Sequence, residues 1–389
     1  MFSTILIYIL IIVLIFWVYS GYVLMLYALI IVGKRSGKAS PEGDHPSVSI
    51  LVPCHNEASF VKEKVKNLEA LDYPKDKLKI IFLDGNSNDG TFDILSEEIK
   101  DLSCMELAQT GCRGKINQLN HILPKIDSQI IVNTDMDTML NADILKEMTK
   151  VFKEDSDIYV VGAHVIPKSH LSFEREYWYL QNRIRFLESK VYCSSIVAAP
   201  CYAFKKGLIK SFPKDCVADD IYISFYANTK GKKTKYAEKA IAYEMRFPDR
   251  MVSLLQHKFR KGNAYITELL RFVYLLPYMN LSWKVIFLTK FLQVIVLPWV
   301  LPFFLISSVS MFLEKGPALL VFKSSMAFLL GSFLTVHFLF IKGRKAAIGT
   351  GKNFPFHVFI ITNAILLLDS IGFPFYRQTS SYEKVDSKR

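Results

Sequence analysis

The chain has 389 residues, of which 51% are hydrophobic, and it contains 29 phenylalanines. Its mean hydropathy of +0.23 is too high for an ordinary soluble protein and indicates membrane segments. The formal net charge is +12, but no helix-turn-helix, zinc-finger or basic-aromatic motif accompanies it, so the sequence predicts no nucleic-acid partner. The sequence also lacks a P-loop and a Gly-x-Gly-x-x-Gly motif, which argues against a kinase and a dehydrogenase. The positive charge is instead typical of the flanks of membrane segments, which meet anionic lipids.

The N-terminal region predicts a transmembrane anchor over residues 1–33. This stretch carries no charge, and its apolar run over residues 5–32 is longer than the roughly 20 residues that cross a bilayer. Lys34, Arg35 and Lys38 follow directly. By the positive-inside rule these basic residues place the part of the chain that follows in the cytoplasm.

The chain between the anchor and the C-terminal apolar region reads as one α/β domain over residues 34–265. Apolar β-runs at 48–52, 79–83, 130–132 and 159–162 alternate with helical stretches at 61–68 and 116–123 and with a helix for which Asn141 is the expected cap. This alternation predicts a mostly parallel sheet. In such sheets ligands bind beyond the carboxyl ends of the strands. Polar side chains follow three of these runs, namely Asn56 and Glu57, Asp84, and Asp135 and Asp137.

Asp135 and Asp137 are separated by one residue. Residues i and i+2 of an extended chain point the same way, so both carboxylates can face one ligand. Two such oxygen donors suit Mg²⁺ or Mn²⁺ and, through the metal, a diphosphate.

The C-terminal part predicts an amphipathic interfacial segment over 266–284, a transmembrane region over 285–376 and a tail over 377–389. Apolar stretches lie at 291–313, 318–341 and 354–375, so we expect about three C-terminal membrane helices. A full crossing by the last stretch would place the tail outside, but the tail is basic, with Arg377, Lys384, Lys388 and Arg389. Both a full crossing and a re-entrant or interfacial course therefore stay open.

Four ordered motifs of the α/β domain resemble those of family 2 glycosyltransferases. They lie at residues 53–57, 84–91, 114–120 and 135–137, and the similarity covers roughly residues 47–265. With its flanking apolar segments, the chain resembles the membrane-embedded synthases of cellulose, chitin, hyaluronan and poly-N-acetylglucosamine, and more distantly ceramide glucosyltransferase. The resemblance implies a GT-A type nucleotide-sugar-binding domain, a nucleotide-diphosphate sugar donor, Mg²⁺ or Mn²⁺, and inversion at the anomeric carbon.

The resemblance assigns donor-binding roles to the first motifs. Asp84 would accept hydrogen bonds from the base or ribose, with Asn56 and Glu57 fixing the nucleotide. The alternative for the motif of Asp84 is a plain turn, which its Gly, Asn, Ser and Asp residues favour. Lys115 would neutralise phosphate or contact the base, although a solvated lysine at a helix start is the commoner case.

The two acids after the third strand would bind the metal. In this assignment Asp137 is the best metal ligand, and Asp135 is shared between the metal and the ribose.

The catalytic base is expected at residues 216–221, which occupy the place of the family's Thr-Glu-Asp motif. Asp220 aligns with the base and Asp219 replaces the usual Glu. Adjacent carboxylates repel each other, which favours a raised pKa in one of them if the site is dry. The alternative is a helix start carrying acids that the helix dipole favours. Residues 198–206 resemble the acceptor-floor segment that precedes the base.

The last family motif, Gln-x-x-Arg-Trp, is degenerate. Anchored on Gln256, the arginine comes one residue late, as Arg260; anchored on Gly262, Lys258 and Phe259 replace Arg and Trp. Between Lys258 and Arg260 the sequence slightly favours Lys258 for the diphosphate. A basic interfacial helix that contacts lipid is the alternative. The departure puts processive polymerisation in doubt more than sugar transfer itself.

These observations predict a multi-pass cell-membrane protein with a metal-dependent, inverting glycosyltransferase domain in the cytoplasm. The donor is expected to be a UDP-sugar and the acceptor a growing polysaccharide, with membrane lipids as neighbours. The alternative acceptor is a lipid that receives a single sugar, as in a glycolipid or polyprenyl-phosphate sugar synthase. The alternative from a different functional class is a transporter or receptor whose α/β domain is catalytically inactive. The sequence does not identify accessory subunits.

Overall fold

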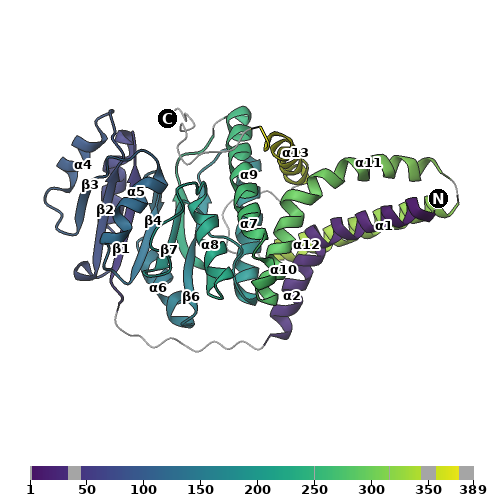
Figure 1. The fold of residues 1–389 in the computed structure, drawn as a ribbon, viewed down its shortest axis with the longest axis horizontal. Helices are drawn as coiled ribbons and strands as arrows, with labels where there is room; N and C mark the ends of the chain where they lie inside the picture. Colours follow the sequence, from purple (N-terminus) through teal and green to yellow (C-terminus); the bar gives the residue numbers. More distant parts are fainter. Residues whose placement is uncertain (1, 34–44, 249, 315, 343–355, 376–389) are drawn as a thin grey trace.

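The computed structural model of the protein describes residues 2–33, 45–248, 250–314, 316–342 and 356–375. A sheet domain forms one end of the molecule, and the apolar helices extend away from it (Figure 1). The basic residues Lys34, Arg35 and Lys38 and the expected tail at 377–389 lie outside the described residues. The predicted cytoplasmic orientation therefore stays a prediction.

The domain is built on one eight-stranded mixed sheet with the strand order β3-β2-β1-β4-β7-β6-β8-β5. β1, β2, β3 and β4 are parallel to one another and β6 is parallel to β8, whereas β7 is antiparallel to both β4 and β6, and β5 is antiparallel to β8. The strands are β1 Val48–Cys54, β2 Leu78–Asp84, β3 Met105–Gln109, β4 Ile130–Thr134, β5 Thr138–Leu140, β6 Ile158–Pro167, β7 Cys201–Lys205 and β8 Lys233–Glu244. The mostly parallel sheet predicted from the sequence is confirmed.

Helices cover both faces of the sheet, because its strands are apolar on both sides. In β1, Ile50 and Val52 pack in one core with the apolar faces of α3 and α6, whereas Leu51 packs in a second core with α5 and α8. The helices of the domain are α3 Val61–Glu69, α4 Thr91–Ile99, α5 Lys115–Ile122, α6 Ile144–Glu154, α7 Ser172–Val191, α8 Asp219–Thr229 and α9 Met251–Val273. Asn141 does not cap α6, which begins at Ile144; the Ile144 amide instead donates to the carbonyl of Asn141 in a turn.

Among the residues that the structure describes, three helices are long and apolar enough to cross a membrane: Ser3–Val32, Leu281–Leu313 and Pro317–Phe340. The first joins α1 Phe2–Phe16 and α2 Tyr22–Val32 through a π-helical turn, η1 Trp17–Gly21. The second joins α10 Leu281–Phe291 and α11 Leu297–Leu313 through another π-helical turn, η6 Leu292–Val296. The third belongs to α12 Pro317–Lys342, and the last apolar stretch forms the shorter α13 Phe356–Gly372.

Residues 266–284, the predicted interfacial segment, comprise the end of α9, a 3₁₀ turn and the start of α10, and their interfacial location stays a prediction. α9 runs through residue 265 to Val273 because no Gly or Pro interrupts its last three turns, and a 3₁₀ turn at Leu276–Tyr278 then leads into α10. The Asn280 side chain accepts a hydrogen bond from the Trp283 amide and so fixes the start of α10.

A buried polar contact ties the sheet domain to the apolar helices. Glu188 of α7 is fully buried, and its Oε1 lies 3.0 Å from Lys290 Nζ of α10 and 2.8 Å from Tyr22 Oη of α2. A buried carboxylate that loses one such partner is strongly destabilised. The contact therefore holds the membrane-type helices and the domain in one fixed arrangement.

Candidate active site

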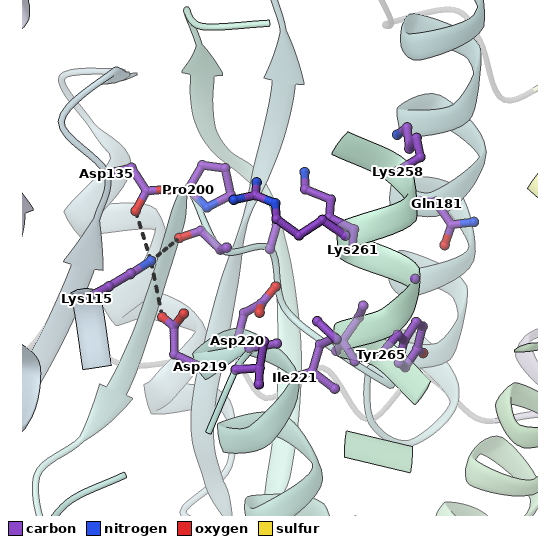
Figure 2. A pocket seen from close by; sticks show the side chains of 18 of the residues that line it. Lys115, Asp135, Gln181, Pro200, Asp219, Asp220, Ile221, Lys258, Lys261 and Tyr265 are labelled. Carbon is purple, nitrogen blue, oxygen red and sulfur yellow. Dashed lines mark hydrogen bonds and ion pairs between the residues drawn. The ribbon is translucent and has the colours of Figure 1, made fainter. Parts of the chain in front are cut away.

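A cavity of about 540 Å³ lies where β1 and β4 end and where α5 and α8 begin, with α7, α9, η6 and α13 as its far walls. Eight of the residues singled out from the sequence line it: Glu57, Lys115, Asp135, Asp137, Asp219, Asp220, Lys258 and Arg260. Three others do not: Asn56, Asp84 and Gln256. Figure 2 shows the acids and the basic helix α9 facing each other across this space.

Lys115, at the start of α5, bridges two acids from different elements (Figure 2). Its Nζ donates to Asp135 Oδ1 at 2.9 Å and lies 3.2 Å from Asp219 Oδ2. The ammonium also donates to the carbonyl of Ala199 at 3.4 Å. Lys115 is therefore a fixed counter-charge that joins the end of β4 to the start of α8, rather than a solvated lysine.

Asp219 and Asp220 follow one another but lie in different surroundings. Asp219 is 5% exposed, and its Oδ2 accepts hydrogen bonds from Tyr202 Oη at 2.6 Å and from Asn133 Nδ2 at 3.3 Å. Asp220 points into the cavity (Figure 2). The pKa of Asp220 is raised to about 6, mainly by burial and then by the negative charge of Asp219, while Lys115 acts in the opposite direction. Asp219 is thus held by hydrogen bonds, whereas Asp220 faces the cavity with a raised pKa.

Asp137 is held by an arginine that no sequence motif indicated. Arg246, two residues beyond the end of β8, places its Nε 3.5 Å from Asp137 Oδ2 and pairs with the carboxylate of Glu57 through its other nitrogens. Its guanidinium also lies 5.0 Å from the ring centroid of Phe60. Arg246 therefore neutralises Asp137 and ties the end of β1 to the end of β8.

The loop that carries Asp135 and Asp137 is clamped from beneath by Lys64 of α3. The side chain of Lys64 is fully buried, and its Nζ donates to Thr134 Oγ1 at 3.2 Å and to the carbonyl of Thr138. Burial lowers the pKa of this lysine to about 8. The sequence held a signal for it, because Lys64 lies on the same face of α3 as the core residues that precede and follow it.

The two acids after β4 are suitable ligands for a divalent ion that also contacts the phosphates of a nucleotide sugar. Within the described ranges, no group of three or more His, Cys, Asp and Glu side chains is placed to hold a metal. Asp135 and Asp137 can therefore offer two carboxylates and no closed cage. This is the donor set typical of Mg²⁺ and Mn²⁺ sites that take their other ligands from substrate phosphates and water.

Asp84 and Asn56 serve the fold of two loops and lie off the cavity surface. Asp84 is 1% exposed, and its carboxylate accepts hydrogen bonds from Ser87 Oγ at 2.5 Å and Ser87 N at 3.2 Å. Asn56, with a φ of 53°, accepts from the Asn88 amide at 2.9 Å through its Oδ1. The motif of Asp84 forms a turn, and its hydrogen bonds lock the loop after β1 to the loop after β2; the donor-binding role of Asp84 stays a prediction.

In α9, the structure reverses the preference between the two basic residues. Lys258 Nζ lies 2.7 Å from Glu174 Oε2 and 3.6 Å from the ring centroid of Tyr177, so its charge is already neutralised. Gln256 is exposed and faces away from the cavity lining. Arg260 lines the cavity, with its Nη2 3.2 Å from His257 Nδ1. Lys261, which no motif indicated, also lines it, and Figure 2 shows its side chain extending toward the acids.

Comparisons with known proteins agree with this geometry. Residues 49–212 match the family model described as "Glycosyl transferase family 2". Beta-monoglucosyldiacylglycerol synthase of Nostoc sp. is 30% identical over 161 residues, which are 40% of this chain and 34% of that protein. Poly-beta-1,6-N-acetyl-D-glucosamine synthase of Staphylococcus aureus is 24% identical over 234 residues, 58% of this chain and 56% of that protein. The chain thus spans only part of the length of both relatives.

A solved structure shares the fold across almost the whole chain. It is the mannosyltransferase PcManGT from Pyrobaculum calidifontis in complex with GDP-Man and Mn²⁺, with a TM-score of 0.70 and 20% sequence identity. The match covers 96% of this chain and 99% of that one. The GT-A type domain flanked by N-terminal and C-terminal apolar helices, as predicted from the sequence, is confirmed.

Proposed function

We propose that this chain, in which residues 49–212 form a glycosyl transferase family 2 domain, is a membrane-bound glycosyltransferase that acts on a membrane-associated acceptor. It would take the sugar from a nucleotide-diphosphate donor, most simply a UDP-sugar, and invert the anomeric carbon. One observation carries the proposal: Asp135, Asp137, Asp219 and Asp220, which are distant in the sequence, line a single cavity at the carboxyl edge of the sheet.

Asp135 and Asp137 would hold Mg²⁺ or Mn²⁺, which when bound stabilises the negative charge that develops on the departing diphosphate. Lys115 and Arg246 already fix these two carboxylates in place. Arg260 of α9 faces the same space and would attract the diphosphate from the opposite side. The neighbour PcManGT, complexed with Mn²⁺ and GDP-Man, supports this assignment.

Asp220 would act as the general base for the acceptor. Its pKa of about 6 lies close to neutral pH, where a base is largely ionised yet still accepts a proton readily. Asp219 would be a positioning residue, because its hydrogen bonds to Tyr202 and Asn133 and its contact with Lys115 fix the start of α8. The proton taken from the acceptor would then leave through the open mouth of the cavity.

The three long apolar helices support a multi-pass location in the cell membrane. We propose that the sheet domain faces the cytoplasm, where nucleotide sugars are made, in line with the basic residues that follow the first helix. The active cavity would then open at the membrane surface, next to membrane lipids and to the acceptor.

Two acceptor classes follow from the relatives and the sequence. The sequence favours a growing polysaccharide, and the match to poly-beta-1,6-N-acetyl-D-glucosamine synthase supports it. A lipid that receives one sugar is the second candidate, and the match to beta-monoglucosyldiacylglycerol synthase supports that class.

The function is tested with the full chain purified into lipid nanodiscs and incubated with a panel of nucleotide sugars. We expect metal-dependent release of the nucleoside diphosphate from one donor, abolished by EDTA and restored by Mn²⁺ or Mg²⁺. Asp220→Asn should reduce the rate about 10²- to 10⁴-fold, whereas Asp76→Asn, an exposed acid outside the cavity, should leave it unchanged. A silent transporter or receptor domain would turn over no donor, and equal rates in both variants would remove Asp220 from the base role.

A further inference from the structure

Two cations on the wall of the active cavity formed by α7 and α9 have no carboxylate partner within the described residues. Arg185 of α7 is 7% exposed; its Nη1 lies 3.5 Å from Asn182 Oδ1, and its Nε has no hydrogen-bond partner in the same part of the chain. Lys261 of α9 places its Nζ 5.3 Å from the ring centroid of Trp178, and the Arg185 guanidinium lies 5.5 Å from the same ring. Arg185 and Lys261 are called the Trp178 cations below.

Several other cations of the cavity wall are neutralised. Four that also line it pair with carboxylates: Lys115 with Asp135 and Asp219, Arg246 with Glu57, Lys258 with Glu174, and Lys290 with Glu188. A buried charge without a partner is costly, so it is retained where a ligand supplies the opposite charge. The Trp178 cations therefore indicate an anionic ligand group on this wall.

A second cavity of about 140 Å³ opens from the same wall into the apolar helices. This side cavity shares five lining residues with the active cavity, which are Tyr177, Gln181, Gln293, Thr362 and Leu366. Its other walls are mainly apolar side chains of α2, α7, α12 and α13, such as Val23, Ile184, Val336 and Val358. The cationic wall of the active cavity thus adjoins an apolar space, whose walls include helices long and apolar enough to cross a membrane.

Both π-helical turns of the described structure border this side cavity. η1 contributes Val18 and Tyr19, and η6 contributes Gln293. A π-helical turn weakens a helix locally and occurs mostly where a function requires the altered side-chain positions. Their meeting at one cavity, from two helices far apart in the sequence, supports a binding role for it.

We infer that the acceptor is a lipid phosphate, with its phosphate between the Trp178 cations and Asp220 and its hydrocarbon chain in the side cavity. The inference rests on the proposed function and selects one of its acceptor classes. A neutral diacylglycerol or a neutral polysaccharide end would leave both cations unpaired, whereas a phosphate monoester neutralises them. The apolar side cavity suits the first part of a lipid chain, which is hydrophobic, and not a sugar polymer, which is hydrophilic.

The transfer step balances with the groups present. A phosphate oxygen attacks C1 of the donor sugar with its lone pair, and the bond between C1 and the diphosphate oxygen breaks. That electron pair leaves on the nucleoside diphosphate, and the product is a sugar linked to the lipid phosphate. A phosphate monoester has a second pKa of about 6, so the molecules that still carry a proton would pass it to Asp220.

The first test compares acceptors with the wild-type chain in nanodiscs and the donor found in the panel. The arms are a long-chain polyprenyl phosphate, the polyprenol of the same length, a diacylglycerol, and inorganic phosphate. We expect one sugar per lipid on polyprenyl phosphate, with kcat/KM at least about 100-fold above the other arms because each lacks either the charge or the chain. Equal use of polyprenol or diacylglycerol, or formation of a polymer, would overturn the inference.

The second test locates the two halves of the site. Arg185→Gln and Lys261→Gln should raise KM for polyprenyl phosphate about 10- to 100-fold, with Arg185→Lys recovering most of the loss. Lys190→Gln, an exposed cation on the same helix outside both cavities, is the matched control. A rise in donor KM with acceptor KM unchanged would assign the Trp178 cations to the donor diphosphate and overturn the inference.

The side cavity is tested by filling it. Ile184→Trp should raise KM for polyprenyl phosphate without raising KM for the donor, whereas Leu330→Trp, on an exposed position of α12, should change neither. An unchanged acceptor KM in Ile184→Trp would remove the chain from this cavity. Failure of the proposed function would look different, because then no nucleotide sugar would be turned over with any acceptor.

Discussion

The ends of β2 and β4 carry similar acidic motifs in the sequence, yet they have different roles in the structure. Asp84, at the end of β2, is buried and bonded to Ser87 three residues later. Asp135 and Asp137, after β4, lie against Lys115 and Arg246, which come from distant elements, and they line the cavity. A carboxylate that accepts hydrogen bonds from neutral donors in its own turn stabilises that turn. A carboxylate paired with cations from distant elements is instead positioned to bind a ligand.

The two strand ends also differ in what their interactions stabilise. The hydrogen bonds of Asp84 stabilise a loop whatever ligand is present. The ion pairs of Asp135 and Asp137 instead neutralise these two carboxylates. A bound metal ion would also neutralise them, and a bound diphosphate would neutralise their basic partners. We therefore expect substitutions after β4 to lower turnover and substitutions at the end of β2 to lower stability.

Asp137→Asn should lower the rate of sugar transfer by a factor on the order of 100 or more, because the metal's charge stabilisation is worth several kcal/mol. The thermal unfolding midpoint should stay within a few degrees of the wild type, because Arg246 keeps its partner Glu57. Steady-state kinetics at saturating Mn²⁺ and a melting curve measure the two properties. A variant with a normal rate would place the metal elsewhere.

The rate of donor hydrolysis should fall about tenfold per pH unit below pH 6 and be level above it. Asp220 acts in its ionised form, and its pKa of about 6 sets the pH below which protonation removes the base. Water as the acceptor does not titrate in this range, so the slope reports the enzyme. An identical slope in Asp220→Asn would show that another group is responsible.

Lys64→Met should raise the donor KM about tenfold, because the lost charged hydrogen bonds leave the two ends of the loop that carries Asp135 and Asp137 unclamped. Lys66→Met changes an exposed lysine on the same helix and serves as the control. Titration of the donor in both variants separates a role in positioning the loop from a general loss of charge.

Asp84→Asn should affect stability more than activity. Loss of the charged acceptor for Ser87 should lower the free energy of unfolding by about 1–3 kcal/mol, while kcat at 25 °C changes less than about threefold. Thermal unfolding and initial rates on the same preparation test both parts. A variant that is stable but inactive would instead support a donor-binding role for Asp84, and the contrast between the two strand ends would be wrong.

Gln256→Ala should have the smallest effect, with both kcat and donor KM within about twofold of the wild type. Gln256 is exposed and does not line the cavity, and exposed substitutions of this kind rarely change more than a few tenths of a kcal/mol. A large loss would mean that α9 turns when substrate binds.

Much of this arrangement could be predicted from the sequence because its causes are local. Apolar runs with a period of two or of a helix indicated β1, β2, β4 and α3, and the spacing of Asp135 and Asp137 indicated a shared ligand. What could not be predicted depends on contacts between distant residues. Arg246 reaches Asp137 only because β8 lies beside β6 and β5 in the sheet, and the motif on α9 did not distinguish Lys258, which Glu174 neutralises, from Lys261.

The most direct test is Mn²⁺ binding in the presence of UDP or GDP, measured by electron paramagnetic resonance on the wild type, Asp137→Asn and Asp84→Asn. The account predicts bound Mn²⁺ in the wild type and in Asp84→Asn, with affinity reduced at least about tenfold in Asp137→Asn. Normal Mn²⁺ affinity in Asp137→Asn, together with its loss in Asp84→Asn, would contradict it.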